Sequence, residues 1–217
     1  MAELKHVFRP QTLDDIVGQP IESLKSMMQS PRASCWMLTG DPGTGKTAVT
    51  KVLAEMLGCT DPWFGLHQFA CASFGIDQVK VLFNEDLRLY SPSSSGFHLV
   101  ILNECEWLSP QVQRFLKNAL DPETDFPTNT IVVGTTNSTE SIDPALLERF
   151  RLLNFKSNEE FARSCRTKIA NVWQYVFQED LPSEAAEWGK MGSQNRFSMR
   201  VAIQHAEDAM QRRLQAC

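Results

Sequence analysis

Eight consecutive residues have the composition and spacing of a phosphate-binding loop. They fit the pattern G-x-x-x-x-G-K-[ST] at every fixed position: Gly40-Asp41-Pro42-Gly43-Thr44-Gly45-Lys46-Thr47. In such a loop the glycines let backbone amides wrap the phosphates, and the following helix N-terminus adds partial positive charge. Lys46 would reach the β- and γ-phosphates, and the Thr47 hydroxyl would bind Mg²⁺. The loop therefore predicts a binding site for a nucleoside triphosphate.

The flanks of this loop support the prediction. An apolar run, Cys35–Leu38, precedes it, and a helical pattern from Ala48 to Leu57 follows it. An ordinary glycine-rich turn is the alternative, but the order strand, loop, helix is the context in which the motif binds phosphates.

A second motif follows the apolar run Leu99–Leu102, which ends in Asn103 and Glu104. Phosphate-loop ATPases of this kind carry Asp-Glu here, where the Asp supports Mg²⁺ and the Glu polarises the attacking water. We expect Glu104 to act as the base, because it directly follows the strand. Asn103 is neutral and would support the metal about tenfold more weakly than Asp. Glu106 would compensate if the loop turns it inward. Alternatively, both glutamates are ordinary acids at a helix N-terminus.

Three further polar residues could act on the same triphosphate. Asn137 ends the apolar run 131–136 and could hold the lytic water or the γ-phosphate, although a turn asparagine is the alternative. Arg149 and Arg200 could stabilise the charge of a phosphoryl-transfer transition state, in one case from a neighbouring subunit. The plainer interpretation is a pair of surface arginines, bound to Glu148 and Glu207.

The elements expected to position these residues alternate between strand and helix. The sequence predicts strands at 34–39, 68–71, 97–102, 130–135 and 152–155, and helices at 21–29, 48–57, 76–90 and 110–120. This alternation is typical of an α/β fold with a doubly wound parallel sheet, in which ligands bind at the carboxyl ends of the strands. The phosphate loop, Glu104 and Asn137 all fall at those ends. The segment 91–96, rich in serine, is predicted to be a flexible surface loop.

After residue 156 the strand signals stop. Ser157-Asn158-Glu159-Glu160 fits a capping box and opens a helix to about Phe177. Two more helices are expected near 183–190 and 198–214. We therefore predict an α/β nucleotide-binding domain over residues 1–156 and a small α-helical lid domain over residues 157–217.

Composition bounds the class of protein. No apolar run approaches 18 residues and the N-terminus lacks a signal-peptide core, so we expect a soluble intracellular protein without a membrane partner. The six cysteines show no metal-binding spacing and are expected to be reduced thiols, at 35, 59, 71, 105, 165 and 217. The net charge of −5 argues against a broadly basic nucleic-acid surface, but leaves room for a local basic stripe.

Taken in order, these motifs resemble those of the AAA+ family of ATPases. The segment from Val7 to Gln19 is similar to the family's N-terminal box, which lies along the adenine and here includes Val17 and Gly18. Residues 40–47 match the first nucleotide motif and 99–104 the second. The resemblance also implies that Asn137 is the first sensor, Arg149 the arginine finger and Arg200 the second sensor.

Within that family the chain looks most like clamp-loader small subunits of the replication factor C type, with some likeness to the Holliday-junction branch-migration motor. The resemblance implies an ATPase that uses ATP and Mg²⁺ in a homo- or hetero-oligomeric ring. Its partners would be DNA and a sliding clamp, in the cytoplasm or in a eukaryotic nucleus. Two alternatives stay open: an ATP-gated assembly module that hydrolyses slowly, and a protein-remodelling ATPase with no role on DNA.

Overall fold

A five-stranded parallel sheet forms the centre of the molecule. The computed structural model describes residues 8–123, 126–191 and 196–215. The strand order is β2-β3-β4-β1-β5, and every pairing is parallel. The strands are β1 (Ser34–Gly40), β2 (Leu66–Ala70), β3 (His98–Asn103), β4 (Thr130–Thr136) and β5 (Arg151–Phe155). The predicted doubly wound parallel sheet is confirmed.

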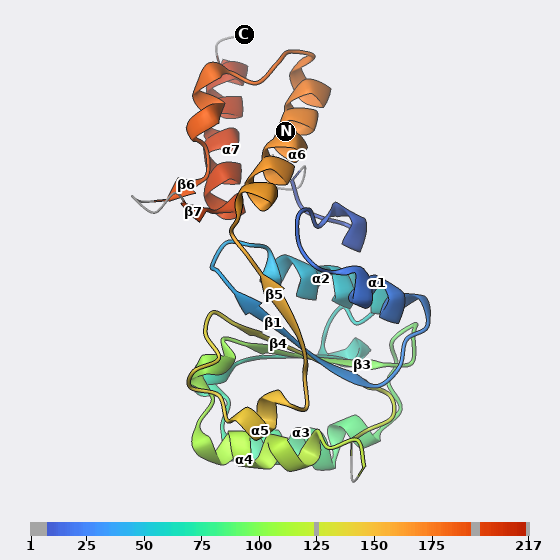
Figure 1. The fold of residues 1–217 in the computed structure, drawn as a ribbon. Helices are drawn as coiled ribbons and strands as arrows, with labels where there is room; N and C mark the ends of the chain where they lie inside the picture. The colour runs from blue at the N-terminus through green and yellow to red at the C-terminus, as the bar shows by residue number, and fades with distance from the viewer. Residues whose placement is uncertain (1–7, 124–125, 192–195, 216–217) are drawn as a thin grey trace.

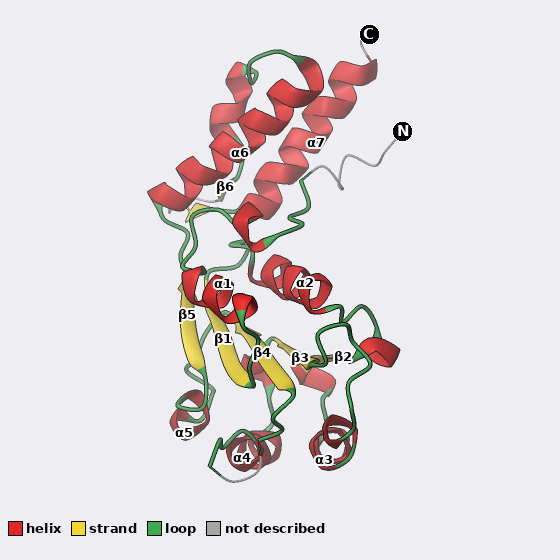
Figure 2. Cartoon of the chain, turned by 90° about the vertical axis from the view of Figure 1, so that its right-hand side faces the viewer, coloured by secondary structure: helices red, strands yellow, loops and turns green. Residues whose placement is uncertain are grey.

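Helices cover both faces of this sheet (Figures 1 and 2). One face carries α1 (Glu22–Gln29) and α2 (Lys46–Leu57), and the other carries α3 (Ile76–Asn84), α4 (Pro110–Ala119) and α5 (Pro144–Leu147). Because successive side chains of a strand point to opposite faces, the apolar runs supply two cores. In β3, for example, Leu99 and Ile101 pack on the α2 side, whereas Val100 and Leu102 pack on the α4 side.

The register of the central strands aligns the carboxyl end of β1 with that of β4. Thr39 of β1 lies opposite Thr136 of β4, and Leu102 of β3 lies opposite Gly134 of β4. The loops that leave β1, β3 and β4 therefore start at the same edge of the sheet.

The lid lies beyond that edge (Figure 2). It contains α6 (Glu159–Phe177), α7 (Met199–Gln215) and a short 3-10 helix (Ser183–Glu187). Trp173 of α6 packs against Trp188, with 5.9 Å between the ring centroids. These two residues belong to a third hydrophobic core, inside the lid, which also includes Phe8 of the N-terminal arm. Val7, the first residue of the predicted N-terminal box, lies outside the described residues.

The lid differs from its prediction in two respects. Strand structure does occur after residue 157, because β6 (Lys190–Met191) and β7 (Arg196–Phe197) pair as an antiparallel hairpin. The cap of α6 is Asn158, whose side chain accepts from the backbone amide of Phe161 at 2.8 Å. Ser157 does not cap the helix, since its hydroxyl exchanges hydrogen bonds with the backbone of Phe197.

Two predictions for residues 76–96 were also wrong. The helix α3 ends at Asn84, and the Arg88 side chain donates from Nε to the carbonyl of Phe83 at 3.1 Å. The serine-rich segment is not simply a surface loop, because Ser91 and Ser93 are buried. Both hydroxyls donate to the Phe97 carbonyl at 2.7 Å, which ties the segment to the start of β3.

The five cysteines that the structure describes are all buried and free: Cys35, Cys59, Cys71, Cys105 and Cys165. Cys217 lies outside the described residues. Within the described ranges, none of the helices combines the length and apolar character that crossing a membrane requires.

Candidate functional site

The phosphate loop connects β1 to α2 through glycines in left-handed conformations. Gly43 has a φ of 77° and Gly45 a φ of 99°, which other residues rarely adopt. A Cβ atom at Gly43 would collide with the side chain of Ser198, which immediately precedes α7 of the lid. One at Gly45 would meet nothing within 4 Å, so this part of the loop faces open space. The loop thus has the open concave backbone that phosphate binding requires.

Lys46, the first residue of α2, is buried, and its ammonium group makes three hydrogen bonds. Nζ donates to the carbonyls of Gly40 and Asp41 at 2.6 and 2.8 Å and to Asn137 Oδ1 at 3.0 Å. Burial lowers the pKa of Lys46, while the nearby charges of Asp41 and Glu106 act in the opposite direction. A positive charge is therefore held at the base of the loop with all three of its protons engaged.

A cavity of about 460 Å³ opens over the carboxyl ends of the strands. Eight of the predicted site residues line it: Pro42, Gly43, Gly45, Lys46, Thr47, Glu104, Asn137 and Arg200. Seven further lining residues were not predicted as site residues: Ala48, Thr135, Thr136, Met199, Ile203, Gln204 and Glu207. The last three of these follow Arg200 at helical spacings of three, four and seven residues, so a helical-face argument from Arg200 would have found them.

A smaller cavity of about 80 Å³ adjoins the first, because Gly45, Ala48, Met199 and Ile203 line both. Val17 and Thr44, two predicted nucleotide-binding residues, contribute to its wall. Most of its lining is apolar, which suits a flat base. Gly18 lies beside it with a φ of 64°, and its backbone packs against Phe161 of the lid.

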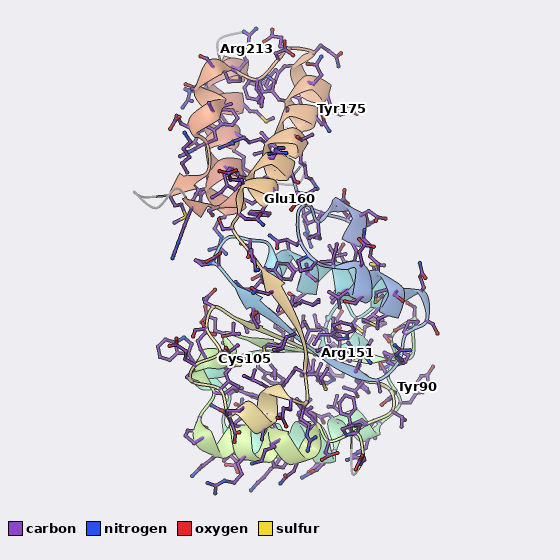
Figure 3. The ribbon with its side chains drawn as sticks, in the orientation of Figure 1. Tyr90, Cys105, Arg151, Glu160, Tyr175 and Arg213 are labelled. Carbon is purple, nitrogen blue, oxygen red and sulfur yellow. The ribbon has the colours of Figure 1, made fainter. Side chains whose placement is uncertain are left out.

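The loop after β3 places its two acids differently. Glu104 is exposed, adopts a left-handed conformation with a φ of 60° and lines the larger cavity. Glu106 is turned inward, as the sequence analysis had considered, and its Oε1 accepts from Asn137 Nδ2 at 3.2 Å. Asn103 lies outside both cavities, and its Nδ2 donates to the Phe69 carbonyl at 3.4 Å. Cys105, labelled in Figure 3, marks the position of this loop.

Asp41 joins the phosphate loop to the lid. Its carboxylate accepts from the backbone amide of Ser157 at 2.9 Å, whereas its carbonyl accepts from Lys46 and from the Thr44 hydroxyl. The side chain of this predicted nucleotide-binding residue therefore faces the junction between the sheet and the lid.

Arg149 lies apart from the other predicted site residues. Its Nη2 forms an ion pair with Asp121 Oδ2 at 2.6 Å, whereas the alternative interpretation as a surface arginine named Glu148 as its partner. Its buried Nε has no hydrogen-bond partner among the described residues. Arg149 lines neither of the two cavities.

A larger cavity, of about 780 Å³, lies in the lid between the start of α6 and the β6–β7 hairpin. None of the predicted site residues lines it. The cavity over the carboxyl ends of the strands is lined by the predicted phosphate-binding and catalytic residues, so the candidate site is assigned to that cavity.

Comparison with known proteins agrees with this geometry. Residues 36–157, more than half of the chain, match the AAA family, the ATPase family associated with various cellular activities. The chain belongs to the AAA family. Its members are nucleotide-binding ATPases, and the match includes the phosphate loop, the loop after β3 and Asn137.

Two curated relatives of this AAA chain have similar sequences. Replication factor C subunit 3 of Saccharomyces cerevisiae is 29% identical over 168 residues, which cover 76% of this chain and 48% of the relative. The replication factor C small subunit of Methanothermobacter thermautotrophicus is 31% identical over 161 residues, which cover 72% of this chain and 49% of the relative. The AAA chain thus spans about half the length of these relatives.

A solved structure matches nearly the whole AAA chain. The RuvB Holliday junction branch migration motor of Thermotoga maritima superimposes with a TM-score of 0.66 at 19% identity, covering 94% of this chain and 66% of that one. At this identity the likeness concerns the fold, and it includes the helical region after the sheet.

Proposed function

We propose that the chain binds ATP with Mg²⁺ in the two adjoining cavities and hydrolyses it to ADP and phosphate. The observation that carries this proposal is the convergence of Lys46, Glu104 and Asn137 on one cavity at the carboxyl ends of three neighbouring strands. Those three residue types, over a glycine-rich loop and a helix N-terminus, are what binding and hydrolysis of a triphosphate require.

Each residue has a separate role in this proposal. Backbone amides of residues 41–46 and the Lys46 ammonium bind the phosphates, while Val17 and Gly18 lie along the base. Thr47 would hold Mg²⁺, which neutralises charge on the phosphate oxygens. Asn103 lines neither cavity, so it would support the metal only weakly, through a metal-bound water. Glu104 polarises the attacking water and Asn137 positions it. Arg200, which enters the cavity from the first turn of α7, senses the γ-phosphate and couples it to the lid.

We further propose that Arg149 completes the site of an adjoining subunit in a ring. Its position outside both cavities and its ion pair with Asp121 support a role toward another chain. In the isolated chain Asp121 would hold the guanidinium until a neighbour's triphosphate competes for it. An arginine supplied in this way is worth about 10³- to 10⁵-fold in rate.

The names of the curated relatives support a clamp-loader-like role in a DNA replication or repair assembly, with a sliding clamp as a partner. On this proposal, lid movement driven by ATP would remodel the assembly, with residues 1–156 as one domain and 157–217 as the other. The compartment would be the cytoplasm, or the nucleus in a eukaryote. The ATP-gated module and the protein-remodelling ATPase remain the alternatives.

The test of the shared site compares two variants that break the same ion pair. Arg149→Ala should abolish steady-state hydrolysis and leave ATP binding by calorimetry unchanged. Asp121→Asn, the matched control, should retain hydrolysis, since it keeps the guanidinium. Equal losses in both variants would assign the ion pair a structural role only, and unchanged turnover in Arg149→Ala would remove the finger assignment.

The test of the DNA role measures hydrolysis with single-stranded, primed and branched DNA at low salt, with the mass in solution recorded alongside. Stimulation by primed DNA supports the clamp-loader role. If none of these DNA structures changes the rate or binds, the DNA role fails and the protein-remodelling alternative gains.

A further inference from the structure

Glu106 is a carboxylate in the site that the roles above leave unused. Its Oε1 accepts two hydrogen bonds from Asn137, from the backbone amide at 3.3 Å and from Nδ2 at 3.2 Å. Its Oε2 is buried and has no hydrogen-bond partner among the described residues. The Ser141 hydroxyl donates to the Glu106 carbonyl at 2.8 Å and holds the backbone in place.

The chemistry of these contacts fixes which way the Asn137 amide points. An ionised carboxylate only accepts hydrogen bonds and an ammonium group only donates them. The NH₂ group of Asn137 must therefore face Glu106, and its oxygen must face Lys46, where it accepts from Nζ at 3.0 Å. A flipped amide would set two donors against each other on one side and two acceptors on the other.

We propose that Glu106 is a positioning residue for nucleotide hydrolysis, which holds the side-chain amide of Asn137 with its oxygen toward Lys46 and the cavity. This inference rests on the proposed function, because it concerns how Asn137 acts on the attacking water. Glu106 is absent from the lining of both cavities, so it acts through Asn137 and makes no contact with the ligand.

The contacts of Lys46 suggest how the orientation of the Asn137 amide contributes to hydrolysis. The three protons of its ammonium group go to Gly40, Asp41 and Asn137. The first two acceptors belong to the loop backbone, whereas the third is a side chain. When a phosphate oxygen takes over that third proton, the Asn137 oxygen becomes free to accept a hydrogen bond from the attacking water. Glu106 keeps the NH₂ group out of that position.

The first test separates turnover from binding. Glu106→Ala should lower kcat by about 10- to 100-fold, since it removes a charged acceptor that orients the amide, and should change KM by less than about threefold. Glu106→Gln should restore most of kcat, because its oxygen can still accept from Asn137. Glu140→Ala is the matched control, an exposed carboxylate on the same loop as Asn137, and should match the parent protein.

A double-mutant cycle tests whether Glu106 acts through Asn137. In an Asn137→Ala background, Glu106→Ala should cause no further loss of kcat. An equal loss in both backgrounds would overturn the proposal, because it would assign Glu106 a role of its own. A KM that rises together with the fall in kcat, without rescue by Glu106→Gln, would also overturn it.

The closing experiment needs no hydrolysis. In ¹⁵N NMR spectra of the full chain without ligand, the side-chain amide signal of Asn137 is identified by its loss in Asn137→Ala. We expect that signal to move toward the position of a solvated asparagine in Glu106→Ala and to stay in place in Glu140→Ala. No movement would refute the proposal. If the parent protein neither binds nor hydrolyses ATP while the signal does move, the proposed function fails and Glu106 still positions Asn137.

Discussion

The phosphate loop and the loop after β3 lie at the same edge of the sheet, but they are held in different ways. Residues 40–47 are shaped by their own glycines and by hydrogen bonds from Lys46 to carbonyls five and six residues away. Residues 103–107 depend on distant partners, because Glu106 contacts Asn137 and Ser141, 31 and 35 positions along the chain. The first loop is held largely from within, with further contacts from Asn137 and Ser157, whereas the second is held largely by the loop after β4.

This difference indicates how the two loops divide the chemistry. A locally determined loop suits binding, which needs a fixed set of amides and one cation. A loop whose side chains contact the residues after a neighbouring strand suits hydrolysis, because its geometry can change when a nucleotide occupies the cavity. Substitutions in the first loop should therefore affect binding, and those in the second should affect turnover.

The largest effect should come from Lys46→Ala. Loss of the buried cation that faces the phosphates should weaken ATP binding by about 1000-fold, as measured by calorimetry. Lys51→Ala, an exposed lysine one turn further along α2, is the control and should bind normally. Tight binding by Lys46→Ala would show that the phosphate loop is not the binding element.

The next effect should come from Glu104→Gln. Loss of a general base should lower kcat by about 100-fold and leave ATP affinity within a few-fold of the parent value. Single-turnover hydrolysis measured beside equilibrium binding would separate the two quantities. A drop in affinity with unchanged kcat would contradict the division between the loops.

Asn103→Asp should have a smaller effect of opposite sign. A carboxylate at this position would give the metal the charge that the amide lacks, so hydrolysis at limiting Mg²⁺ should rise about tenfold. The Mg²⁺ dependence of the rate is the measurement. A large gain would favour the ATP-gated module, in which this asparagine slows turnover, and no gain would count against it.

The smallest effect is a pH dependence of the stability, which arises from two histidines in β2 and β3. His67 of β2 and His98 of β3 lie 3.1 Å apart, Nε2 to Nδ1, and burial, with His98 as a second cause, lowers the pKa of His67 to about 4. An unfolded histidine has a pKa near 6.5, so between pH 6.5 and about 4 the unfolded chain binds a proton that the folded chain does not. Stability should therefore fall as the pH drops through this window.

Urea unfolding at pH 7 and pH 5 measures this loss. His67→Gln, which cannot take up the proton, should show a smaller difference between the two pH values than the parent protein. An equal difference in both would show that other groups cause the pH dependence.

The same contrast explains what the sequence could and could not predict. The sheet, the phosphate loop and most of the helix bounds follow from apolar runs, glycine positions and helical spacing, which are local signals. The cavity assignment of Glu104 and Asn137 also followed, because both come directly after buried strands.

The remainder depended on contacts between distant residues. Nothing near Arg149 indicates that Asp121, 28 positions earlier, binds it. The burial of Ser91 and Ser93 depends on the carbonyl of Phe97, where a serine-rich composition alone suggests solvent exposure. The sequence allowed the hypothesis that Glu106 turns inward, but it did not indicate that Asn137 is its partner.

A structure of the full chain with Mg²⁺ and a non-hydrolysable ATP analogue would show directly whether the phosphate loop holds the nucleotide. We expect phosphates on the amides of the phosphate loop, a phosphate oxygen within hydrogen-bond distance of Lys46 Nζ, and the base beside Val17. A loop with no phosphate in it at saturating analogue, or a nucleotide bound elsewhere with Lys46 still on Asn137, would contradict this expectation.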